Sequence, residues 1–330
     1  MYCLELAGDD DAFAACEARS AALALDVDTP GVATARGIDA DRIRTLAYTH
    51  AASELIATTD ADIEAAEAAL RAATIDRSGS VAVRARDVRS TTGCSTQTAE
   101  RQLGSVLVDR GFSVDLDDPD HELRVLFSEG EVGGEHRDRC FIGWLTVESN
   151  RDFGERRPTD RPFFQPGSMA PLDARALVNI AGAGPDSRVV DPMCGTGGVL
   201  LEAGLVGAHV VGVDAQWKMT RGSRENLDAL LDGGWEIIHG DATALPMADG
   251  AADAVVFDAP YGRQSKIARH DLADLVGGAL AEAHRIADRA VVVADRSWEA
   301  EARAAGWTVD RRFKRRVHGT LVRHVHVLSG

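Results

Sequence analysis

Residues 189–203 read VVDPMCGTGGVLLEA: a short apolar run, an acidic residue, a turn with three glycines and an apolar segment of helix-forming residues. Glycine has no Cβ, so Gly195, Gly197 and Gly198 allow the backbone to turn sharply and a ligand to approach it closely. A helix that begins at such a turn presents unpaired N–H groups and the positive end of its dipole. The stretch predicts a ligand-binding turn between a buried strand and a helix, and its spacing differs from the dinucleotide fingerprint G-x-G-x-x-G.

A second apolar run, residues 254–257, ends in the pentapeptide DAPYG at residues 258–262. The two motifs fit the first and fourth strands of a doubly wound parallel sheet, in which ligands bind at the carboxyl ends of the strands. The glycine turn by itself is equally compatible with another nucleotide-binding α/β protein. The second motif favours a narrower class of enzyme.

Together the two motifs resemble those of class I methyltransferases that use S-adenosylmethionine. The glycine turn is similar to their first motif, and DAPY is similar to the [Asp/Asn]-Pro-Pro-[Tyr/Phe] signature of enzymes that methylate exocyclic amino groups of nucleic-acid bases. Ala259 departs from that signature, because many relatives have a proline there. The backbone carbonyl is kept, whereas the rigidity of the loop is in question.

Residues 161–181, RPFFQPGSMAPLDARALVNIA, are very similar to the loop and helix before the catalytic domain of archaeal tRNA guanine-10 N2-methyltransferases. The elements predicted over Arg42–Glu148, in the order α-α-β-α-β-β, are similar to the THUMP domain, an RNA-binding module. The resemblance covers essentially the whole chain. It implies a small α/β module (1–45), an α+β THUMP domain (46–150), a linker or loop (151–170) and a Rossmann-like α/β methyltransferase domain with a C-terminal β-hairpin (171–330).

Residue spacing also predicts individual elements. Asp9 is expected to cap a helix that runs to about Leu25, and apolar spacing predicts helices over Arg42–Thr58 and Ile63–Ala73. Asp60 or Asp62 is expected to cap the last of these helices. After Ser187 a regular βα alternation is expected, with a long helix over Ile267–Ala287 and a hairpin that turns at His318-Gly319.

Acidic residues at strand ends are candidates for binding the cofactor. Asp214 is placed to accept the ribose hydroxyls, Asp241 to reach the adenine amino group with the Ala242 N–H beside the ring, and Asp191 to lie near the sulfonium. The alternative for each acid is a loop residue or a helix cap. The predicted cofactor-binding residues are Phe164, Asp191, Cys194, Gly195, Thr196, Gly197, Asp214, Asp241, Ala242 and Asp258. Cys194 is expected to pack beside the cofactor, since amine methylation needs no covalent nucleophile.

The predicted catalytic residues are Asp258, Ala259, Pro260 and Tyr261. The lone pair of a base amine is delocalised into the ring, so an acceptor for the N–H protons is needed to restore density on nitrogen. The Asp258 carboxylate and the Ala259 carbonyl supply acceptors. Pro260 stiffens the loop, and Tyr261 is expected to stack on an extruded base.

The net charge is −16, and only three of the 36 basic residues are lysine. An acidic, lysine-poor surface favours a protein adapted to a cytoplasm at molar salt, where its self-repulsion is screened. The alternative is an ordinary acidic protein from a GC-rich genome. The five scattered cysteines form no C-x-x-C pair, so neither a metal site nor disulfides are expected. No signal peptide or membrane span is visible, so a cytoplasmic location is expected. A monomer that binds tRNA is expected as well.

The resemblance implies methylation of N2 of guanine 10 in tRNA, once or twice, with S-adenosylmethionine as methyl donor. One alternative is the same reaction on another RNA guanine, at tRNA position 6 or in rRNA. Another is a THUMP RNA-binding protein with an inactive methyltransferase domain. Arg84, Arg86, Arg89 and Arg101 are candidates for phosphate contacts, with a solvated surface as the alternative for each. The basic run RRFKRR (311–316) is another candidate, which equally could protect a strand edge.

The charge predicts a stability that depends on salt. The Debye length falls from about 10 Å at 0.1 M salt to about 3 Å at 1 M, so salt should relieve the repulsion among the excess acidic groups. We expect the melting temperature to rise as KCl is raised through this range. A melting temperature independent of KCl contradicts the halophile interpretation.

Overall fold

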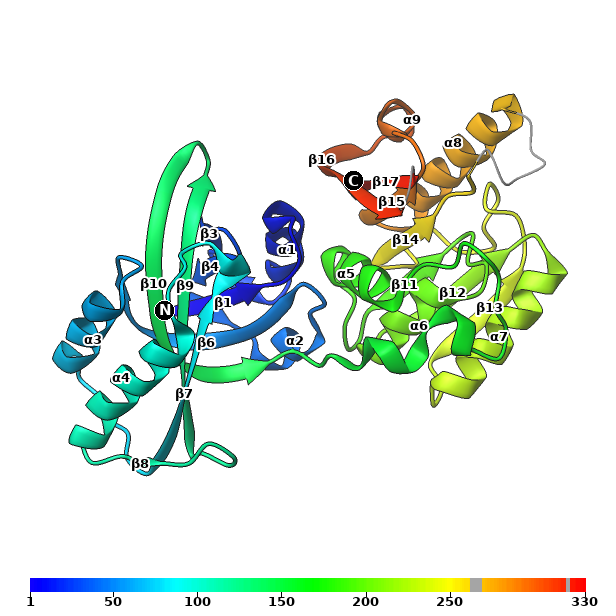
Figure 1. The fold of residues 1–330 in the computed structure, drawn as a ribbon. Coiled ribbons are helices and arrows are strands. Elements are labelled where there is room, and N and C mark those ends of the chain that lie inside the picture. The colour runs from blue at the N-terminus through cyan, green and yellow to red at the C-terminus, as the bar shows by residue number, and fades with distance from the viewer. Residues whose placement is uncertain (262–268, 319–320) are drawn as a thin grey trace. The chain divides into compact units, whose positions relative to one another are not determined.

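The computed structural model describes residues 1–261, 269–318 and 321–330, and it divides into two compact units, Met1–Asn150 and Arg151–Gly330 (Figure 1). Gly262, the predicted helix start at Ile267 and the predicted hairpin turn at Gly319 lie outside the described residues. Each unit has its own sheet. The two units are therefore described separately.

The N-terminal unit is built on an eight-stranded sheet of order β3-β4-β1-β6-β10-β9-β7-β8. Its strands are β1 (Tyr2–Leu6), β3 (Asp26–Thr29), β4 (Val32–Ala35), β6 (Thr49–Thr59), β7 (Ser80–Asp87), β8 (Ser113–Val114), β9 (His121–Val132) and β10 (Glu135–Glu148), and a separate pair is formed by β2 (Ala22–Leu23) and β5 (Gly37–Ile38). Its helices are α1 (Asp11–Ala18), α2 (Ala40–Thr45), α3 (Ile63–Ala72) and α4 (Thr96–Asp109). The predicted module 1–45 and the predicted THUMP segment share this one sheet.

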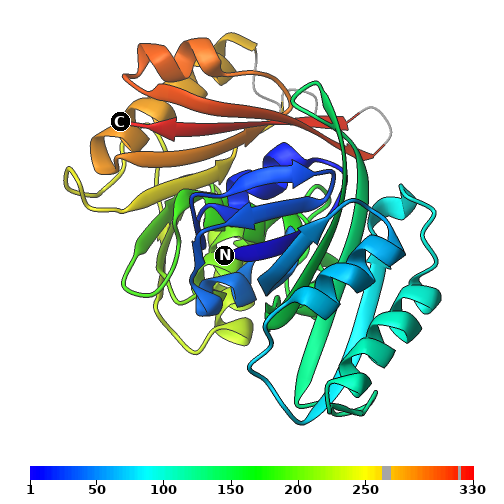
Figure 2. The same cartoon turned by 90° about the vertical axis from the view of Figure 1, so that its left-hand side faces the viewer.

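Helices α3 and α4 pack on each other and on the sheet, against β6 and β7 (Figures 1 and 2). Their apolar faces place Leu70 and Leu103 in a core with Leu123 and Trp144 from the strands. Asp62 caps α3 by accepting from the Ala65 N–H at 2.9 Å, which decides between the two predicted caps. This core is the apolar contact that holds the helices to the sheet.

The predicted helix over Arg42–Thr58 is wrong. Only α2 is helical, and Thr49–Thr59 is strand β6, which pairs antiparallel with β1 and β10 at the centre of the sheet. Backbone pairing on both sides satisfies the amides of this segment, so tertiary contacts override a helical spacing of apolar residues. The observed order from α2 onward is therefore α-β-α-β-α-β-β, with the short β8 added before β9.

The predicted cap of the first helix is also shifted. Asp10, not Asp9, accepts from the Phe13 N–H at 3.0 Å, and α1 ends at Ala18 rather than near Leu25. After Ala18 the chain turns into β2 and β3. The capped Phe13 is buried, which agrees with a helix that begins at Asp11.

The C-terminal unit has a seven-stranded sheet of order β13-β12-β11-β14-β15-β17-β16, in which β17 is antiparallel to both neighbours and the rest are parallel. Its strands are β11 (Arg188–Asp191), β12 (His209–Asp214), β13 (Trp235–His239), β14 (Ala254–Asp258), β15 (Arg289–Ala294), β16 (Thr308–His318) and β17 (Leu321–Ser329). Its helices are α5 (Pro171–Ala181), α6 (Gly198–Leu205), α7 (Trp217–Leu230), α8 (Arg269–Ile286) and α9 (Glu299–Ala304). This strand order confirms the predicted class I methyltransferase fold.

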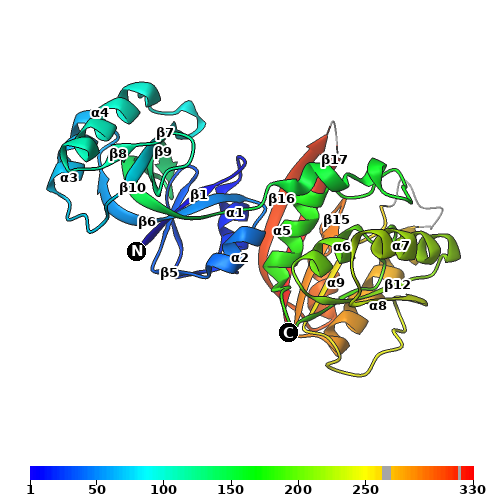
Figure 3. The same cartoon turned by 90° about the horizontal axis from the view of Figure 1, so that it is seen from below.

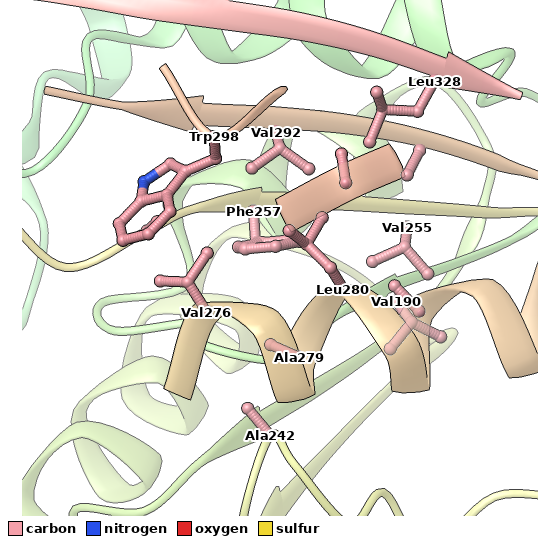
Figure 4. Close-up of a cluster of buried hydrophobic side chains, with 14 of the residues drawn as sticks. Val190, Ala242, Val255, Phe257, Val276, Ala279, Leu280, Val292, Trp298 and Leu328 are labelled. Atoms are coloured by element: carbon pink, nitrogen blue, oxygen red, sulfur yellow. The ribbon is translucent and has the colours of Figure 1, made fainter. Parts of the chain in front are cut away.

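Helices cover both faces of this sheet (Figure 3). On one face, Leu280 of α8 packs with Val190, Phe257 and Val292 from three parallel strands, in the cluster shown in Figure 4. On the other face α6 lies so close to β12 that a Cβ at Gly212 would come within 2.5 Å of Leu200. Continuous apolar runs in the strands reflect this burial on both faces.

Residues 151–170 are packed onto the C-terminal unit. Arg156 donates from Nε to Glu202 Oε1 at 2.7 Å, and Arg175 of α5 reaches Glu202 Oε2 at 2.8 Å. Glu202 is fully buried in α6, and both arginines are buried as well. Two cations around one buried carboxylate therefore anchor the first residues of this unit to helices α5 and α6.

We expect Glu202→Gln to destabilise the C-terminal unit by about 3 kcal/mol, because it removes the buried carboxylate charge that two buried guanidinium groups share. Glu225→Gln is the matched control. Glu225 makes an exposed contact with Arg221 at 3.7 Å, which is worth less than about 0.5 kcal/mol. Tryptophan fluorescence during urea unfolding measures the effect, since four of the five tryptophans lie after residue 150. Equal midpoints for the two variants contradict this assignment.

Candidate active site

The glycine turn joins β11 to α6. Gly195 and Gly197 have φ of 52° and 77°, in the left-handed region that favours glycine, and a Cβ at Gly197 would lie 3.1 Å from the Ser223 Cβ. The Cys194 N–H donates to the Val213 carbonyl at 3.0 Å, which ties the turn to β12. Both the close approach and the positive φ explain the run of small residues after Met193.

A cleft of about 210 Å³ lies beside this turn. One wall is the loop 165–169, and the opposite wall comes from residues 193–196. Ser168 and Thr196 join the walls through their hydroxyl oxygens, which are 3.1 Å apart. Asp191 and Asp258 also line the cleft, so the structure brings the two sequence motifs together at one site.

Asp214 lies next to the turn at the end of β12. Its carboxylate accepts from the Gly195 N–H at 3.0 Å and from the Gln216 N–H at 2.8 Å. Burial raises the pKa of Asp214 in spite of these bonds. Each carboxylate oxygen can accept more than one hydrogen bond, so a ribose hydroxyl can still be accepted. Asp214 therefore both shapes the turn and keeps acceptor capacity.

Asp191 accepts from the Met193 N–H at 3.0 Å and is almost fully buried. Burial raises the pKa of Asp191 well above its ordinary value, and the nearby charges of Asp214 and Asp258 raise it further. Three acidic side chains in one buried place favour a cationic ligand, whose positive charge would stabilise their ionised forms. The sulfonium of S-adenosylmethionine is such a cation, and the N–H groups of a glycine turn suit the remainder of the molecule.

Five residues predicted for the cofactor do not line the cleft: Phe164, Gly197, Asp214, Asp241 and Ala242. The exposed Asp241 accepts at Oδ1 from the Thr243 N–H at 2.9 Å and from its hydroxyl at 2.8 Å, and Ala242 is buried in the core of the unit. Phe164 is 42% exposed. For Asp241 the observed geometry is that of a turn-capping acid. The cofactor-binding roles of all the predicted residues, inside and outside the cleft, remain predictions.

Cys194 does line the cleft, and its side chain packs inward. The thiol is buried, and its sulfur lies 3.9 Å from the Ser223 hydroxyl. Burial raises the pKa of this thiol well above its ordinary value, so it is a poor nucleophile. This geometry agrees with a packing role.

The Asp258 loop is held to the sheet by Ala259. The Ala259 N–H donates to the Val293 carbonyl at 2.8 Å, and the Ala259 methyl is buried in the core of the unit. A proline at this position would have no N–H to donate. The hydrogen bond therefore restrains the loop where relatives use a proline ring.

Arg323 is a site residue that the sequence did not reveal. It comes from β17, donates from Nε to the Tyr261 hydroxyl at 3.0 Å, and places Nη2 3.8 Å from Asp258 Oδ2. Burial raises the pKa of Asp258 to about 6, while the Arg323 charge and the Tyr261 hydrogen bond lower it. Only the hairpin predicted at the C-terminus hinted that another strand could reach the site.

Among residues 1–261, 269–318 and 321–330, no group of three or more His, Cys, Asp or Glu side chains is arranged to hold a metal ion. In the same described part of the chain, no helix has the length and hydropathy of a membrane span.

The sheet order, the glycine turn and the acidic side chains at the strand ends define a class I methyltransferase that uses S-adenosylmethionine. The UPF0020 family, described as an RMKL-like methyltransferase domain, matches residues 158–324. The tRNA (guanine(10)-N2)-dimethyltransferase of Methanothermobacter thermautotrophicus is 34% identical over 336 residues, which cover 95% of this chain and 94% of the relative. The chain belongs to this archaeal tRNA (guanine(10)-N2)-dimethyltransferase family.

One further relative agrees with this assignment, and one solved structure shares the fold. The enzyme of the same name from Pyrococcus abyssi is 30% identical over 257 residues, 76% of this chain and 74% of that one. The crystal structure of TrmN from Thermus thermophilus matches with a TM-score of 0.51 and 23% identity and covers 99% of both chains. The second match shows that the fold is shared over the whole chain.

We expect Asp214→Ala to weaken S-adenosylmethionine binding by about 1.5–3 kcal/mol, because hydrogen bonds to a charged acceptor are lost and the Gly195 N–H is left without its partner. Asp228→Ala, an exposed change on α7, is the matched control. Isothermal titration calorimetry gives both affinities. An Asp214→Ala affinity equal to that of the control removes Asp214 from the cofactor site.

Proposed function

We propose that the protein transfers methyl groups from S-adenosylmethionine to the N2 amine of guanine 10 in tRNA, first once and then a second time. The observation that carries this proposal is the placement of Asp258 in the same cleft as the glycine turn, in a chain of this family. An acceptor for amine protons then faces the site where a methyl donor would bind.

S-adenosylmethionine, when bound, supplies a methyl group on a cationic sulfur. We propose that the glycine turn with Asp191 and Asp214 holds and orients it, and that Asp258 accepts a proton from the guanine amine. The Ala259 carbonyl is the second acceptor. Orientation of the two reacting atoms accounts for most of the remaining rate enhancement.

We infer that the N-terminal unit is the RNA-binding THUMP domain. Among the arginines predicted to contact phosphates, Arg86 is paired with Glu5, and Arg89 contacts Asp11 at 2.6 Å. These pairs favour structural roles for both. Arg84 and Arg101 lie beside the groove between α4 and β7. Arg84 donates to the Leu116 carbonyl at 2.6 Å, so Arg101 is the better candidate for a phosphate contact.

The basic run 311–316 forms part of β16, the edge strand of the C-terminal sheet. Arg311 and Lys314 are exposed there, whereas Arg312 pairs with Glu299 of α9. We infer that this edge also contacts tRNA phosphates. The alternative is that its charges only protect the edge strand from pairing with another strand. We further infer a cytoplasmic, metal-independent monomer adapted to high salt.

The target nucleotide is tested with transcripts. We expect purified protein to incorporate labelled methyl groups into a tRNA transcript with guanine at position 10, and incorporation to be lost when position 10 is adenine. Nuclease digestion and mass spectrometry identify mono- and dimethylated guanosine. Equal incorporation into both transcripts means that another guanine, such as that at position 6, is the target. No incorporation into any RNA supports the alternative of an inactive methyltransferase domain.

We expect Asp258→Asn to separate binding from chemistry. Asparagine keeps the shape but cannot take the proton of the amine, so single-turnover methylation should fall by at least about 10²-fold. Cofactor affinity should stay within a few-fold of the wild type. Asp274→Asn, on an exposed position of α8, is the control. A near-normal transfer rate for Asp258→Asn would reduce this residue to a strand-end acid.

A further inference from the structure

Arg323 contacts three side chains, one of which is the catalytic aspartate. It is 6% exposed, and its Nε and Nη2 reach Tyr261 and Asp258 as described above. Its Nη1 lies 3.7 Å from Oδ2 of Asp173, which belongs to α5. A buried guanidinium thus connects the last strand of the chain with the Asp258 loop and with the first helix of the unit.

We propose that Arg323 is a positioning residue that, together with Tyr261, holds Asp258 by Oδ2 and leaves Oδ1 to accept the proton of the guanine amine. This inference rests on the proposed function. In the step that it serves, N2 gains the methyl group and loses a proton, the bond from the methyl group to sulfur breaks, and the proton passes to Asp258.

The second carboxylate oxygen supports this assignment. Oδ1 of Asp258 is buried and has no hydrogen-bond partner among the described residues, although Asp258 lines the cleft. A buried acceptor without a donor is unfavourable. An amine N–H of the substrate would supply the missing donor. The carboxylate therefore has one engaged oxygen and one that is available to a substrate.

Four neighbouring groups affect the ionisation of Asp258. Arg323 of β17 and the Tyr261 hydroxyl lower its pKa, whereas the charge of Asp295, which follows β15, raises it. Asp191 of β11 is close enough for mutual repulsion with Asp258. Among these neighbours Arg323 is the cation. Its charge lowers the pKa of Asp258, whereas burial and the two negative charges raise that pKa. Without it the carboxylate would hold its proton to a higher pH.

The shape of the arginine side chain matters as well as its charge. The three nitrogens of the planar guanidinium face three side chains, two in the Asp258 loop and one on α5. A lysine ammonium on its flexible stem cannot reproduce this geometry. Asp173 also lies 3.5 Å from Arg315 of β16, which is paired in register with Arg323. The Asp173 carboxylate therefore contacts both arginines of this pair and helps to fix the position of Arg323.

The test is the pH dependence of kcat/KM for methylation of the tRNA transcript. In the wild type the acid limb should lie near pH 6, with activity lost as pH falls and Asp258 is protonated. Arg323→Gln removes the charge and keeps a hydrogen-bond donor, so it should move this limb to higher pH by about one unit or more. Arg323→Lys restores a charge and should return the limb most of the way.

The matched control is Arg312→Gln, on the neighbouring strand and paired with Glu299, which should leave the limb in place. An unmoved limb in Arg323→Gln overturns the proposal, even if activity falls equally at every pH. If that variant does not fold, Tyr261→Phe decides, because loss of its hydrogen bond should move the limb in the same direction by a smaller amount. A wild type that methylates no RNA instead removes the proposed function, so the two failures are distinguishable.

Discussion

The catalytic unit depends on the burial of acidic side chains at the carboxyl edge of its parallel sheet. Asp191, Asp214 and Asp258 end three neighbouring strands, and burial raises the pKa of each. Such a group is stable as an anion only where donors or cations face it. Backbone N–H groups serve Asp191 and Asp214, and a guanidinium serves Asp258. The same constraint therefore explains the geometry of the turn and underlies the proposal that a cationic methyl donor binds beside it.

The loop 165–169, which forms one wall of the cleft, is anchored by polar contacts of the residues before it. The loop 165–169 follows a segment that is tied to α6 by Arg156 and Glu202, and the Phe163 N–H donates to the Asn226 side chain at 2.8 Å. The Asn226 amide also donates to the Thr196 carbonyl at 2.9 Å, within the glycine turn. One asparagine thus connects both walls. A segment that looks like a linker in the sequence contributes half of the site.

Much of the catalytic unit was predictable because its signals are local. Each parallel strand is a short apolar run bounded by turn residues, and the glycines at 195 and 197 are required by positive φ. The N-terminal unit was less predictable. Strand β6 carries apolar residues at a spacing that also fits a helix, and only its pairing with β1 and β10 decides between them. The local sequence of a strand cannot reveal its conformation when the two strands that pair with it lie far away in the sequence.

The sequence by itself determined the class of enzyme, because a glycine turn and an Asp-Ala-Pro-Tyr strand end are contiguous motifs that resemble those of one enzyme class. It also predicted which residue accepts a proton. Only the tertiary structure decided what surrounds that residue. Arg323 lies 65 positions beyond Asp258, and the antiparallel β17 brings it to the site through pairing with β15. The pKa of a buried carboxyl depends on such through-space neighbours, and their proximity is a property of the folded sheet rather than of any stretch of the chain.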